Sequence, residues 1–319
     1  LMRSPALARL AAGLLAAIAL AGSPVRAGEQ RAIAVGPAER GYFEHVPAGL
    51  PLGAPLVVML HGAGGNGRHA AETYGWVEKA DAAGFLLIAP DASPVLADRR
   101  PSFLANPRVW NDGSGRAGPN VSGSDDIGLL RALIERAARD HGIDRRRVYV
   151  SGFSSGSSMT QRAGVEMSAE IAAIAPAAGD LFAAAPELAR GMPVLYLLGD
   201  SDPLAPYDGG EVRYPWGQRV YHKEPARLVP ERWAALNRCT GRAQSHPQAE
   251  VRLLRWSGCR DGVEVAFYTV EGMGHHWPGS ARGALMERYS GASKDPFRAV
   301  DLIWDFFRRW SLPAHPPGR

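Results

Sequence analysis

The sequence is poor in cysteine, has no basic tract and carries no apolar run long enough to cross a membrane. Only two of its 319 residues are cysteines, Cys239 and Cys259, and His246 is the single histidine between them. Two thiols and one imidazole fall short of the four ligands of a structural zinc site. The apolar run at 10–21 is shorter than the roughly 20 residues that a membrane-spanning helix needs. We therefore expect no metal centre and no stable membrane anchor.

The first 27 residues have the pattern of an export signal. Two arginines, the apolar run at 10–21 and the sequence V-R-A at 25–27 follow one another as in secretory signal peptides. Ser23 stands where a lipid anchor would require a cysteine. Cleavage after Ala27 would remove three arginines and no acid, lowering the formal charge from +4 to +1. So small a positive charge argues against nucleic-acid binding, and we expect a secreted or periplasmic protein.

Past residue 27 the chain shows no internal repeat, long linker or low-complexity block. The sequence predicts strands at 56–60, 85–89, 147–150, 171–175, 193–198 and 263–270. It predicts helices at 68–83, 127–141, 155–167, 225–237 and 296–310, the second of them capped by the acidic pair at 125–126. Apolar strands separated by helices are typical of a mostly parallel sheet covered on both faces. We expect one α/β domain over 28–312, followed by a Pro-rich tail at 313–319.

A strand, a G-x-S-x-G motif and a helix follow one another at 148–167, with the motif at Gly152-Phe153-Ser154-Ser155-Gly156. A serine on a sharp strand-to-helix turn is raised above the sheet, and such a turn leaves no space for side chains two residues to either side. The next amide lies at a helix N-terminus, where it can bind an oxyanion. The motif alone is weak in a chain with 37 glycines. Its context predicts that Ser154 is a nucleophile and that the Ser155 amide is an oxyanion donor.

A second glycine-rich loop, with the sequence L-H-G-A-G-G-N-G at 60–67, directly follows an apolar strand. α/β-Hydrolases place a second oxyanion amide in a loop of this kind, which makes the Ala63 N–H the candidate donor. His61 is expected to be a structural hydrogen-bonding residue of the loop and not the catalytic base. A tight glycine turn without a ligand is the alternative interpretation.

Acidic residues and histidines follow the last two predicted strands. Asp200 and Asp202 come after the fifth strand, and His275 and His276 come after the sixth. The order serine, acid, histidine is the one that α/β-hydrolases use. A buried carboxylate would orient the imidazole, which would take the proton from Ser154. The residue pattern alone does not choose between the two acids or between the two histidines.

The motifs closely resemble those of polyhydroxybutyrate depolymerase-like and feruloyl esterase-like secreted esterases (carbohydrate esterase family 1 and relatives). The resemblance covers nearly all of 28–312 and includes L-H-G-x-G-G-N at 60–66, Trp110-Asn111, D-D-I-G at 125–128, the G-x-S-x-G motif, and G-H-x-W-P at 274–278. The family patterns G-x-x-D-P and G-H-x-W-P imply that Asp202 is the acid and His275 the base. Two cysteines in an exported protein favour a disulfide over two free thiols. The resemblance implies that Cys239 and Cys259 form it.

The resemblance implies an α/β-hydrolase that hydrolyses carboxylic esters through an acyl-enzyme without a cofactor. The expected substrates are hydroxybutyrate or hydroxyalkanoate oligomers, or feruloyl and acetyl-polysaccharide esters. Trp110, Trp216 and Trp277 are candidates for lining the substrate cleft, with core packing as the alternative. A serine peptidase, a cell-envelope acyltransferase and a non-catalytic binding protein are weaker alternatives. One catalytic domain accounts for 28–312, so soluble esters are expected to be better substrates than polymer granules.

Overall fold

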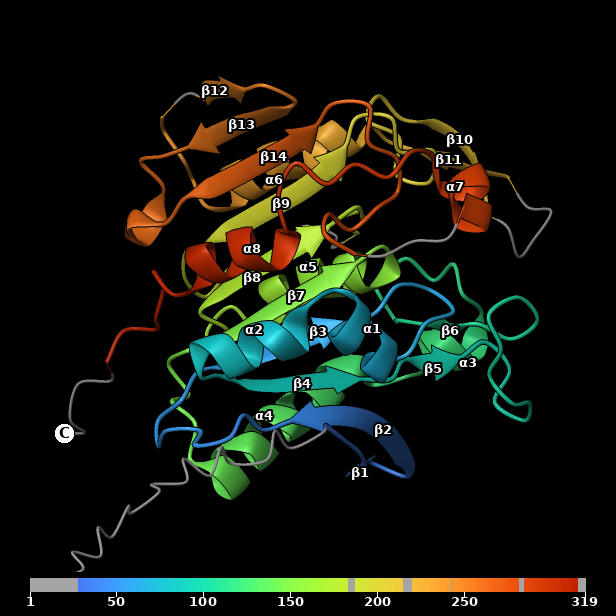
Figure 1. Ribbon diagram of the computed structural model, residues 1–319, viewed down its shortest axis with the longest axis vertical. Helices are drawn as coiled ribbons and strands as arrows, with labels where there is room; N and C mark the ends of the chain where they lie inside the picture. Colours follow the sequence, from blue (N-terminus) through green and yellow to red (C-terminus); the bar gives the residue numbers. More distant parts are fainter. Residues whose placement is uncertain (1–27, 183–186, 215–219, 242, 281–283, 315–319) are drawn as a thin grey trace, which may run out of the picture.

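The computed structural model describes residues 28–182, 187–214, 220–241, 243–280 and 284–314. A ten-stranded sheet forms its centre, in the spatial order β1 (Glu29–Val35), β2 (Ala38–His45), β4 (Leu86–Pro90), β3 (Leu56–Leu60), β7 (Val148–Phe153), β8 (Ala173–Ala177), β9 (Val194–Gly199), β14 (Val265–Val270), β13 (Val251–Trp256) and β12 (Gln244–Gln248) (Figure 1). Strands β4 to β14 in this order are parallel. Antiparallel pairs extend the sheet on both sides. Two separate two-stranded sheets are formed by β5 (Ser93–Pro94) with β6 (Arg108–Val109), and by β10 (Gly210–Arg213) with β11 (Val220–Lys223).

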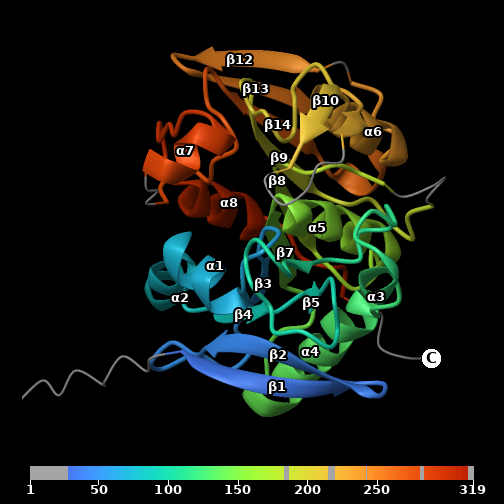
Figure 2. The same cartoon turned by 90° about the vertical axis from the view of Figure 1, so that its right-hand side faces the viewer.

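Helices cover both faces of the sheet. One face carries α1 (Gly67–Thr73), α2 (Trp76–Ala83) and α8 (Ala299–Phe307), and the other carries α4 (Asp126–His141), α5 (Ser155–Glu166) and α6 (Val229–Leu236) (Figure 2). The remaining helical segments are α3 (Pro119–Ser122), α7 (Ala284–Ser290), and the single turns η1 (Ala226–Leu228) and η2 (Arg260–Gly262). This arrangement confirms the predicted α/β architecture with a mostly parallel sheet.

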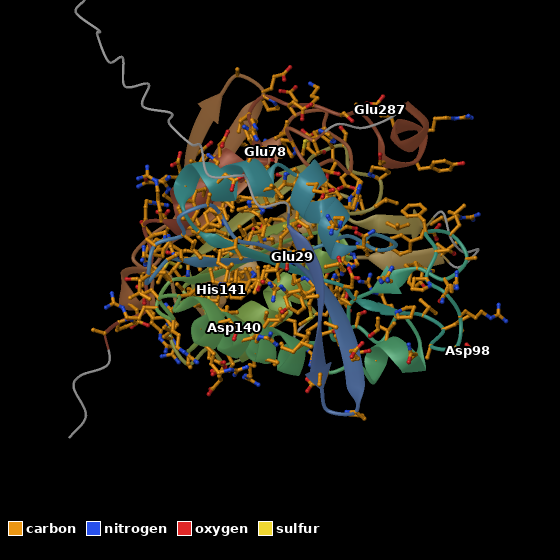
Figure 3. The ribbon with its side chains drawn as sticks, turned by 60° about the horizontal axis from the view of Figure 1, so that its bottom comes forward. Glu29, Glu78, Asp98, Asp140, His141 and Glu287 are labelled. Atoms are coloured by element: carbon orange, nitrogen blue, oxygen red, sulfur yellow. A yellow bond between two sulfur atoms is a disulfide. The ribbon has the colours of Figure 1, made fainter. Side chains whose placement is uncertain are left out.

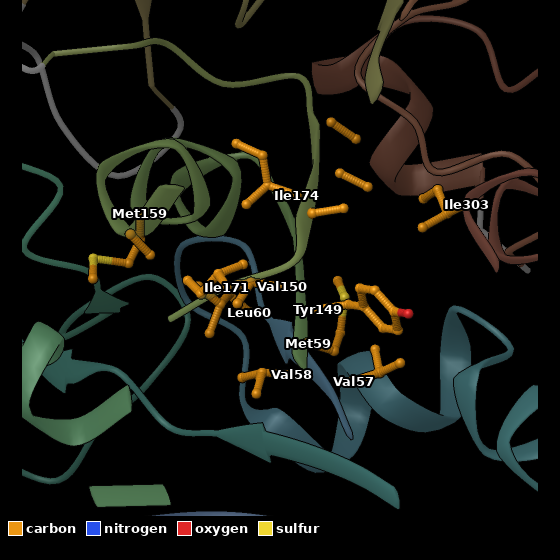
Figure 4. Close-up of a cluster of buried hydrophobic side chains, with 14 of the residues drawn as sticks. Val57, Val58, Met59, Leu60, Tyr149, Val150, Met159, Ile171, Ile174 and Ile303 are labelled. Carbon is orange, nitrogen blue, oxygen red and sulfur yellow. The ribbon is translucent and has the colours of Figure 1, made fainter. Parts of the chain in front are cut away.

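The core lies along the central strands β3 and β7, in which every residue is buried. Successive side chains of a strand point to opposite faces, so both helical layers receive apolar side chains from the same strands. Figure 4 shows this alternation: one face presents Val57, Met59 and Tyr149 towards Ile303 of α8, and the other presents Val58, Leu60 and Val150 towards Met159 of α5. The charged residues Glu29, Glu78, Asp98, Asp140 and Glu287, which are labelled in Figure 3, are exposed.

The antiparallel strands β1, β2, β12 and β13 were not predicted from the sequence, and the structure changes or refines two predicted local features. The single helix expected at 68–83 is broken at Gly75, whose φ of +79° is accessible to glycine. At the acidic pair, the Asp125 carboxylate accepts a hydrogen bond from the Gly128 N–H at 2.7 Å and caps α4 as predicted. Its neighbour Asp126 is instead buried in an ion pair with Arg40 at 2.7 Å.

The structure pairs Cys239 with Cys259 in a disulfide, which joins the chain just after α6 to the turn η2. Among the described residues, no helix combines the length and the apolar character that crossing a bilayer requires. The predicted signal segment at 1–27, Trp216 and residues 315–319 of the predicted tail lie outside the described residues.

Candidate active site

The predicted site residues come together because they follow neighbouring parallel strands. Ala63 follows β3, Ser154 follows β7, Asp202 follows β9 and His275 follows β14. Carboxyl ends of parallel strands lie at one edge of a sheet, which is where open α/β sheets bind ligands. A cavity of about 440 Å³ opens at this edge, and Ala63, Ser154, Ser155 and His275 are among the residues that line it.

Ser154 occupies a strained turn between β7 and α5. Its φ of +56° and ψ of −119° are unusual for a residue with a side chain, and its N–H donates to the Ala177 carbonyl at 2.9 Å. A Cβ on Gly152 would lie 2.2 Å from the Gly156 carbonyl oxygen, and a Cβ on Gly156 would lie 2.2 Å from the Leu60 oxygen. Close backbone approach therefore requires both glycines of the G-x-S-x-G motif.

His275 and Asp202 form a buried hydrogen-bonded pair. His275 Nδ1 lies 2.8 Å from Asp202 Oδ2, while the other carboxylate oxygen accepts from the Leu204 and Ala205 N–H groups at 2.8 Å each. Burial alone would raise the pKa of Asp202, but the adjacent His275 ring and the two amides outweigh it, and the pKa is lowered. The carboxylate therefore stays ionised and fixes one imidazole tautomer, with the proton on Nδ1.

The alternative acid and the alternative histidine lie elsewhere. Asp200 Oδ1 accepts from the Gly272 N–H at 2.7 Å and makes no contact with His275 among the described residues. His276 is fully buried, and its Nε2 lies 2.7 Å from Asp295 Oδ1. Of the two acids and two histidines, only Asp202 and His275 are paired with each other beside the cavity.

The glycine-rich loop after β3 approaches the serine closely. A Cβ on Gly62 would lie 3.3 Å from Ser154 Cβ, and the loop is held in place by the Gly64 N–H donating to the Arg108 carbonyl at 2.8 Å. The amides of Ala63 and Ser155 donate to no protein acceptor in the described parts of the chain, so both remain available to a ligand.

His61 supports this loop from inside the protein. Burial lowers the pKa of His61 to about 4, which keeps its ring neutral at neutral pH. Its Nε2 accepts from the Ala92 N–H at 3.0 Å, so Nδ1 carries the proton and donates to the Gly62 carbonyl at 2.7 Å. These contacts agree with the structural role expected for His61.

The two described tryptophan candidates differ in position. Trp110 lines the cavity, although it is 1% exposed, and its Nε1–H donates to the His61 carbonyl at 2.8 Å. Trp277 is fully buried, stacks on Tyr74 at a ring-centroid distance of 4.9 Å and is not part of the cavity wall. The expectation that Trp277 lines the cleft is therefore corrected: its place is in the core, where its ring packs against those of Tyr74, Trp76 and Phe153.

The cavity also contains charged residues that the sequence motifs do not predict, namely Asp112, Arg116 and Lys223. Asp112 directly follows the Trp110-Asn111 motif, so the motif could have indicated that Asp112 lies near the site. Arg116 lies four residues further along the chain. Lys223 comes from β11, a strand with no apolar run that sequence patterning could detect. Among the described residues, no group of three or more His, Cys, Asp or Glu side chains is arranged to hold a metal ion.

A model of the family described as esterase PHB depolymerase matches residues 41–239, more than half of the chain. The chain belongs to the esterase PHB depolymerase family. The matched range contains the oxyanion-loop candidate Ala63, Ser154 and Asp202, whereas His275 lies beyond it.

Curated relatives of this esterase PHB depolymerase family member carry esterase names. A feruloyl esterase B from Piromyces equi is 29% identical over 215 residues, which cover 65% of this chain and 34% of the relative. A bifunctional acetylxylan esterase/xylanase from Neocallimastix patriciarum is 24% identical over 281 residues, covering 86% of this chain and 34% of the relative. The chain thus spans about a third of the length of these two relatives. An esterase-like protein, NocK, from Nocardia uniformis subsp. tsuyamanensis is 30% identical over 305 residues, covering 86% of this chain and 81% of the relative.

Solved structures share the fold of this family member at low sequence identity. An acetyl xylan esterase from Aspergillus awamori superposes with a TM-score of 0.55 at 15% identity, covering 82% of this chain and 98% of the other. Esterase PE8 superposes with a TM-score of 0.51 at 17% identity, covering 83% of this chain and 96% of the other. Together with the mostly parallel sheet, these similarities confirm the predicted α/β-hydrolase fold.

Proposed function

We propose that this chain is a secreted serine esterase that hydrolyses carboxylic esters through an acyl-enzyme. Ser154 is the nucleophile, His275 the general base and then the general acid, and Asp202 the residue that orients His275. One observation carries this proposal: Ser154 and His275 line the same cavity, and His275 is hydrogen-bonded on its far side to a buried carboxylate at 2.8 Å. Membership of an esterase family supports an ester as the scissile bond.

The first half of the reaction transfers the acyl group to the enzyme. Ser154 Oγ attacks the ester carbonyl carbon and gives its proton to His275 Nε2, and the C=O π electrons move onto oxygen. The Ala63 and Ser155 N–H groups donate to this oxyanion. When the C–O bond to the alcohol breaks, the imidazolium returns the proton to the leaving oxygen. The Asp202 carboxylate accepts the Nδ1–H throughout and stabilises the charged ring.

The second half releases the acid. A water molecule takes the place of the alcohol, His275 removes its proton, and the hydroxide oxygen attacks the acyl carbon. Collapse of the second tetrahedral intermediate breaks the bond to Ser154 Oγ, which recovers its proton from His275. The oxyanion donors are fixed by backbone geometry, so they require no rearrangement during either half-reaction.

Candidate substrates are feruloyl or acetyl esters of polysaccharides and hydroxyalkanoate oligomers. Relatives named feruloyl esterase, acetylxylan esterase and poly(3-hydroxyalkanoate) depolymerase support these classes. The cavity of about 440 Å³ falls within the size range of small-molecule sites, roughly 300–1,000 Å³. Export is proposed from the signal-like pattern at 1–27, and the disulfide between Cys239 and Cys259 supports an oxidising compartment.

The direct test is hydrolysis of 4-nitrophenyl butyrate compared with a peptide 4-nitroanilide. We expect ester hydrolysis by the wild type and no measurable anilide cleavage. Ser154→Ala should lower kcat by about three orders of magnitude or more, because the triad acts as a unit. Ser122→Ala, a matched change at an exposed position of helix α3, should leave kcat unchanged. A folded Ser154→Ala protein that keeps more than a few per cent of the activity would contradict the proposal.

A further inference from the structure

The walls of the cavity beside Ser154 differ in polarity. One wall is apolar and comes from the segment between β5 and β6, with Val95, Leu96, Leu104, Ala105 and Pro107. The other, here called the polar wall, consists of Asp112, Ser114, Arg116, Tyr214, Tyr221 and Lys223. Ester hydrolysis itself needs only the triad and the oxyanion donors, so the polar wall has no task in the chemical steps described above.

Arg116 is held rigidly within the polar wall. Its guanidinium lies 3.0 Å from the Asp112 carboxylate, its Nε–H donates to Ser114 Oγ at 2.9 Å, and a terminal N–H donates to the Tyr214 hydroxyl at 3.4 Å. The guanidinium carbon also lies 4.2 Å from the centre of the Phe182 ring. A guanidinium has five N–H donors in one plane. Because that of Arg116 is held on several sides, its remaining N–H groups point in a defined direction.

Lys223 completes the polar wall from the β10–β11 sheet. Its side chain is 8% exposed, and its ammonium lies 2.7 Å from Asp180 and donates to the Leu204 carbonyl at 2.9 Å. An ammonium has three N–H donors, so one remains after these two contacts. Asp180 lies 3.9 Å from Arg116 as well, so a single carboxylate bridges the two cations.

The charges of this cluster cancel. Two cations, Arg116 and Lys223, face two carboxylates, Asp112 and Asp180, within 4 Å. An anionic ligand would meet the carboxylates, and a cationic ligand would meet the cations. An uncharged hydroxyl both donates and accepts, so it can use the remaining N–H groups and carboxylate lone pairs together. The rings of Tyr214 and Tyr221, 5.3 Å apart, add aromatic surface to the same wall.

We infer that the polar wall binds an uncharged, hydroxyl-bearing part of the ester, and that Arg116 and Lys223 determine preference for such substrates. This inference rests on the proposed function, because it concerns substrate selection at the same site. A phenolic hydroxyl on the acyl group and the hydroxyls of a sugar alcohol offer the same chemistry. Esters of plain aliphatic acids and alcohols do not.

Matched ester pairs test the inference. Methyl 4-hydroxycinnamate and methyl cinnamate differ by one phenolic hydroxyl. Acetylated xylobiose and cyclohexyl acetate compare a hydroxylated with a plain ring alcohol. We expect kcat/KM of the wild type to favour the hydroxylated member of at least one pair by about tenfold or more, since buried polar groups left without a partner penalise the other member. The pair that shows the preference identifies the source of the hydroxyl. Methyl 4-carboxycinnamate should be a poor substrate, because its negative charge faces the Asp112 carboxylate in the cavity wall.

Lys223→Met probes the wall itself. Losing the ammonium removes the N–H donor that Lys223 offers to a ligand hydroxyl, so we expect the preference to fall to within about twofold of unity. Lys79→Met is the matched control, since Lys79 pairs with Asp301 between α2 and α8 and does not line the cavity. It should keep the wild-type preference. Wild-type ratios below about two in both pairs, or an unchanged preference in folded Lys223→Met, would overturn the inference.

Binding to the Ser154→Ala protein separates this inference from the proposed function. Calorimetric titration with methyl 4-hydroxycinnamate and methyl cinnamate, and with the acetyl pair, measures recognition without turnover. The preferred hydroxylated ester should bind about tenfold more tightly than its partner. A wild type without esterase activity would refute the proposed function, yet tenfold tighter binding would still support the polar wall. Equal binding within both pairs would refute the wall whether or not esters are hydrolysed.

Discussion

Two histidine–aspartate pairs lie side by side in this protein and differ in what surrounds them. His275 pairs with Asp202 at 2.8 Å, and His276 pairs with Asp295 at 2.7 Å. The Asp202 side chain is completely buried, whereas that of Asp295 is 48% exposed. His275 lines the cavity that contains Ser154, and His276 does not. A short contact between imidazole and carboxylate therefore does not by itself identify a catalytic base. What distinguishes His275 is that its ring lines the cavity that contains Ser154.

Asp295 nevertheless has a clear structural role. Its Oδ1 also accepts from the Gly279 N–H at 2.5 Å, so it holds both ends of the turn that follows His275. The same turn is fixed by the Gly274 N–H donating to the Ala292 carbonyl at 2.8 Å. The second pair thus stabilises the loop that carries His275.

Replacing the two histidines should give the largest contrast. We expect His275→Ala to lower kcat for 4-nitrophenyl butyrate by about three orders of magnitude or more, as loss of any triad base does. His276→Ala should change kcat by less than about tenfold but lower the free energy of unfolding by roughly 2–4 kcal/mol, because it leaves a cavity in the core. Steady-state kinetics and urea unfolding measure the two effects. Equal inactivation of both folded variants, or the reverse order, would show that the wrong histidine has been assigned.

Replacing Asp202 should lower kcat more than replacing Asp295, although the contrast should be smaller than that between the two histidines. Asp202→Asn should lower kcat by about two to three orders of magnitude, since an amide no longer fixes the tautomer or stabilises the imidazolium. Asp295→Asn keeps an oxygen that can accept from Gly279 and should stay within about threefold of the wild type. KM should change little in Asp202→Asn, because Asp202 is not part of the cavity wall. Comparable kcat losses in the two variants would argue against the distinction between the pairs.

A third histidine, His61, provides the smallest and most specific contrast, which is a pH-dependent change in the free energy of unfolding. The pKa of His61 is lowered to about 4 by burial, against an ordinary value of 6.5. Between these values the unfolded chain binds a proton that the folded chain excludes, so the free energy of unfolding should fall as pH decreases from 6.5 to 4. The loss is on the order of 3 kcal/mol and is complete just below pH 4.

His61→Gln removes this titration, so its stability should change less across the same interval than that of the wild type. Denaturant unfolding at pH 7, 5.5 and 4 measures the difference. The lowered pKa of Asp202 acts at lower pH, because its stabilisation is present above the ordinary value of 3.8 and is lost as pH falls through the lowered one. Identical pH profiles for wild type and His61→Gln would show that His61 is not buried in its neutral form.

The sequence predicted the elements that have strong local signals. The apolar runs of the central strands and the G-x-S-x-G motif around Ser154 are short sequence patterns that can be recognised without knowledge of the contacts they make. The apolar runs predicted the strands that Ser154, Asp202 and His275 follow, and the order of these residues along the chain agreed with the one that α/β-hydrolases use. The choice between Asp202 and Asp200 came from a family resemblance, because both acids lie in the same short loop after β9.

Features that depend on contacts between distant segments were not predictable. The break at Gly75 needs knowledge that α8 packs against α2, with Arg298 2.8 Å from where a Cβ on Gly75 would lie. The burial of Trp277 depends on Tyr74, some 200 positions earlier in the chain. Lys223 of the polar wall and its partner Asp180 come from separate segments, and neither has a local pattern that distinguishes it from a solvated surface charge.

Covalent labelling with a fluorophosphonate tests the central claim most directly, because such reagents react with a serine only when a base and an oxyanion site activate it. The tryptic peptide 148–162 contains five serines, so fragment-ion mass spectrometry must locate the adduct. We predict one adduct per chain, on Ser154, formed in parallel with loss of esterase activity and absent from Ser154→Ala. Labelling of another residue with loss of activity, or full activity in protein modified at Ser154, would contradict the account.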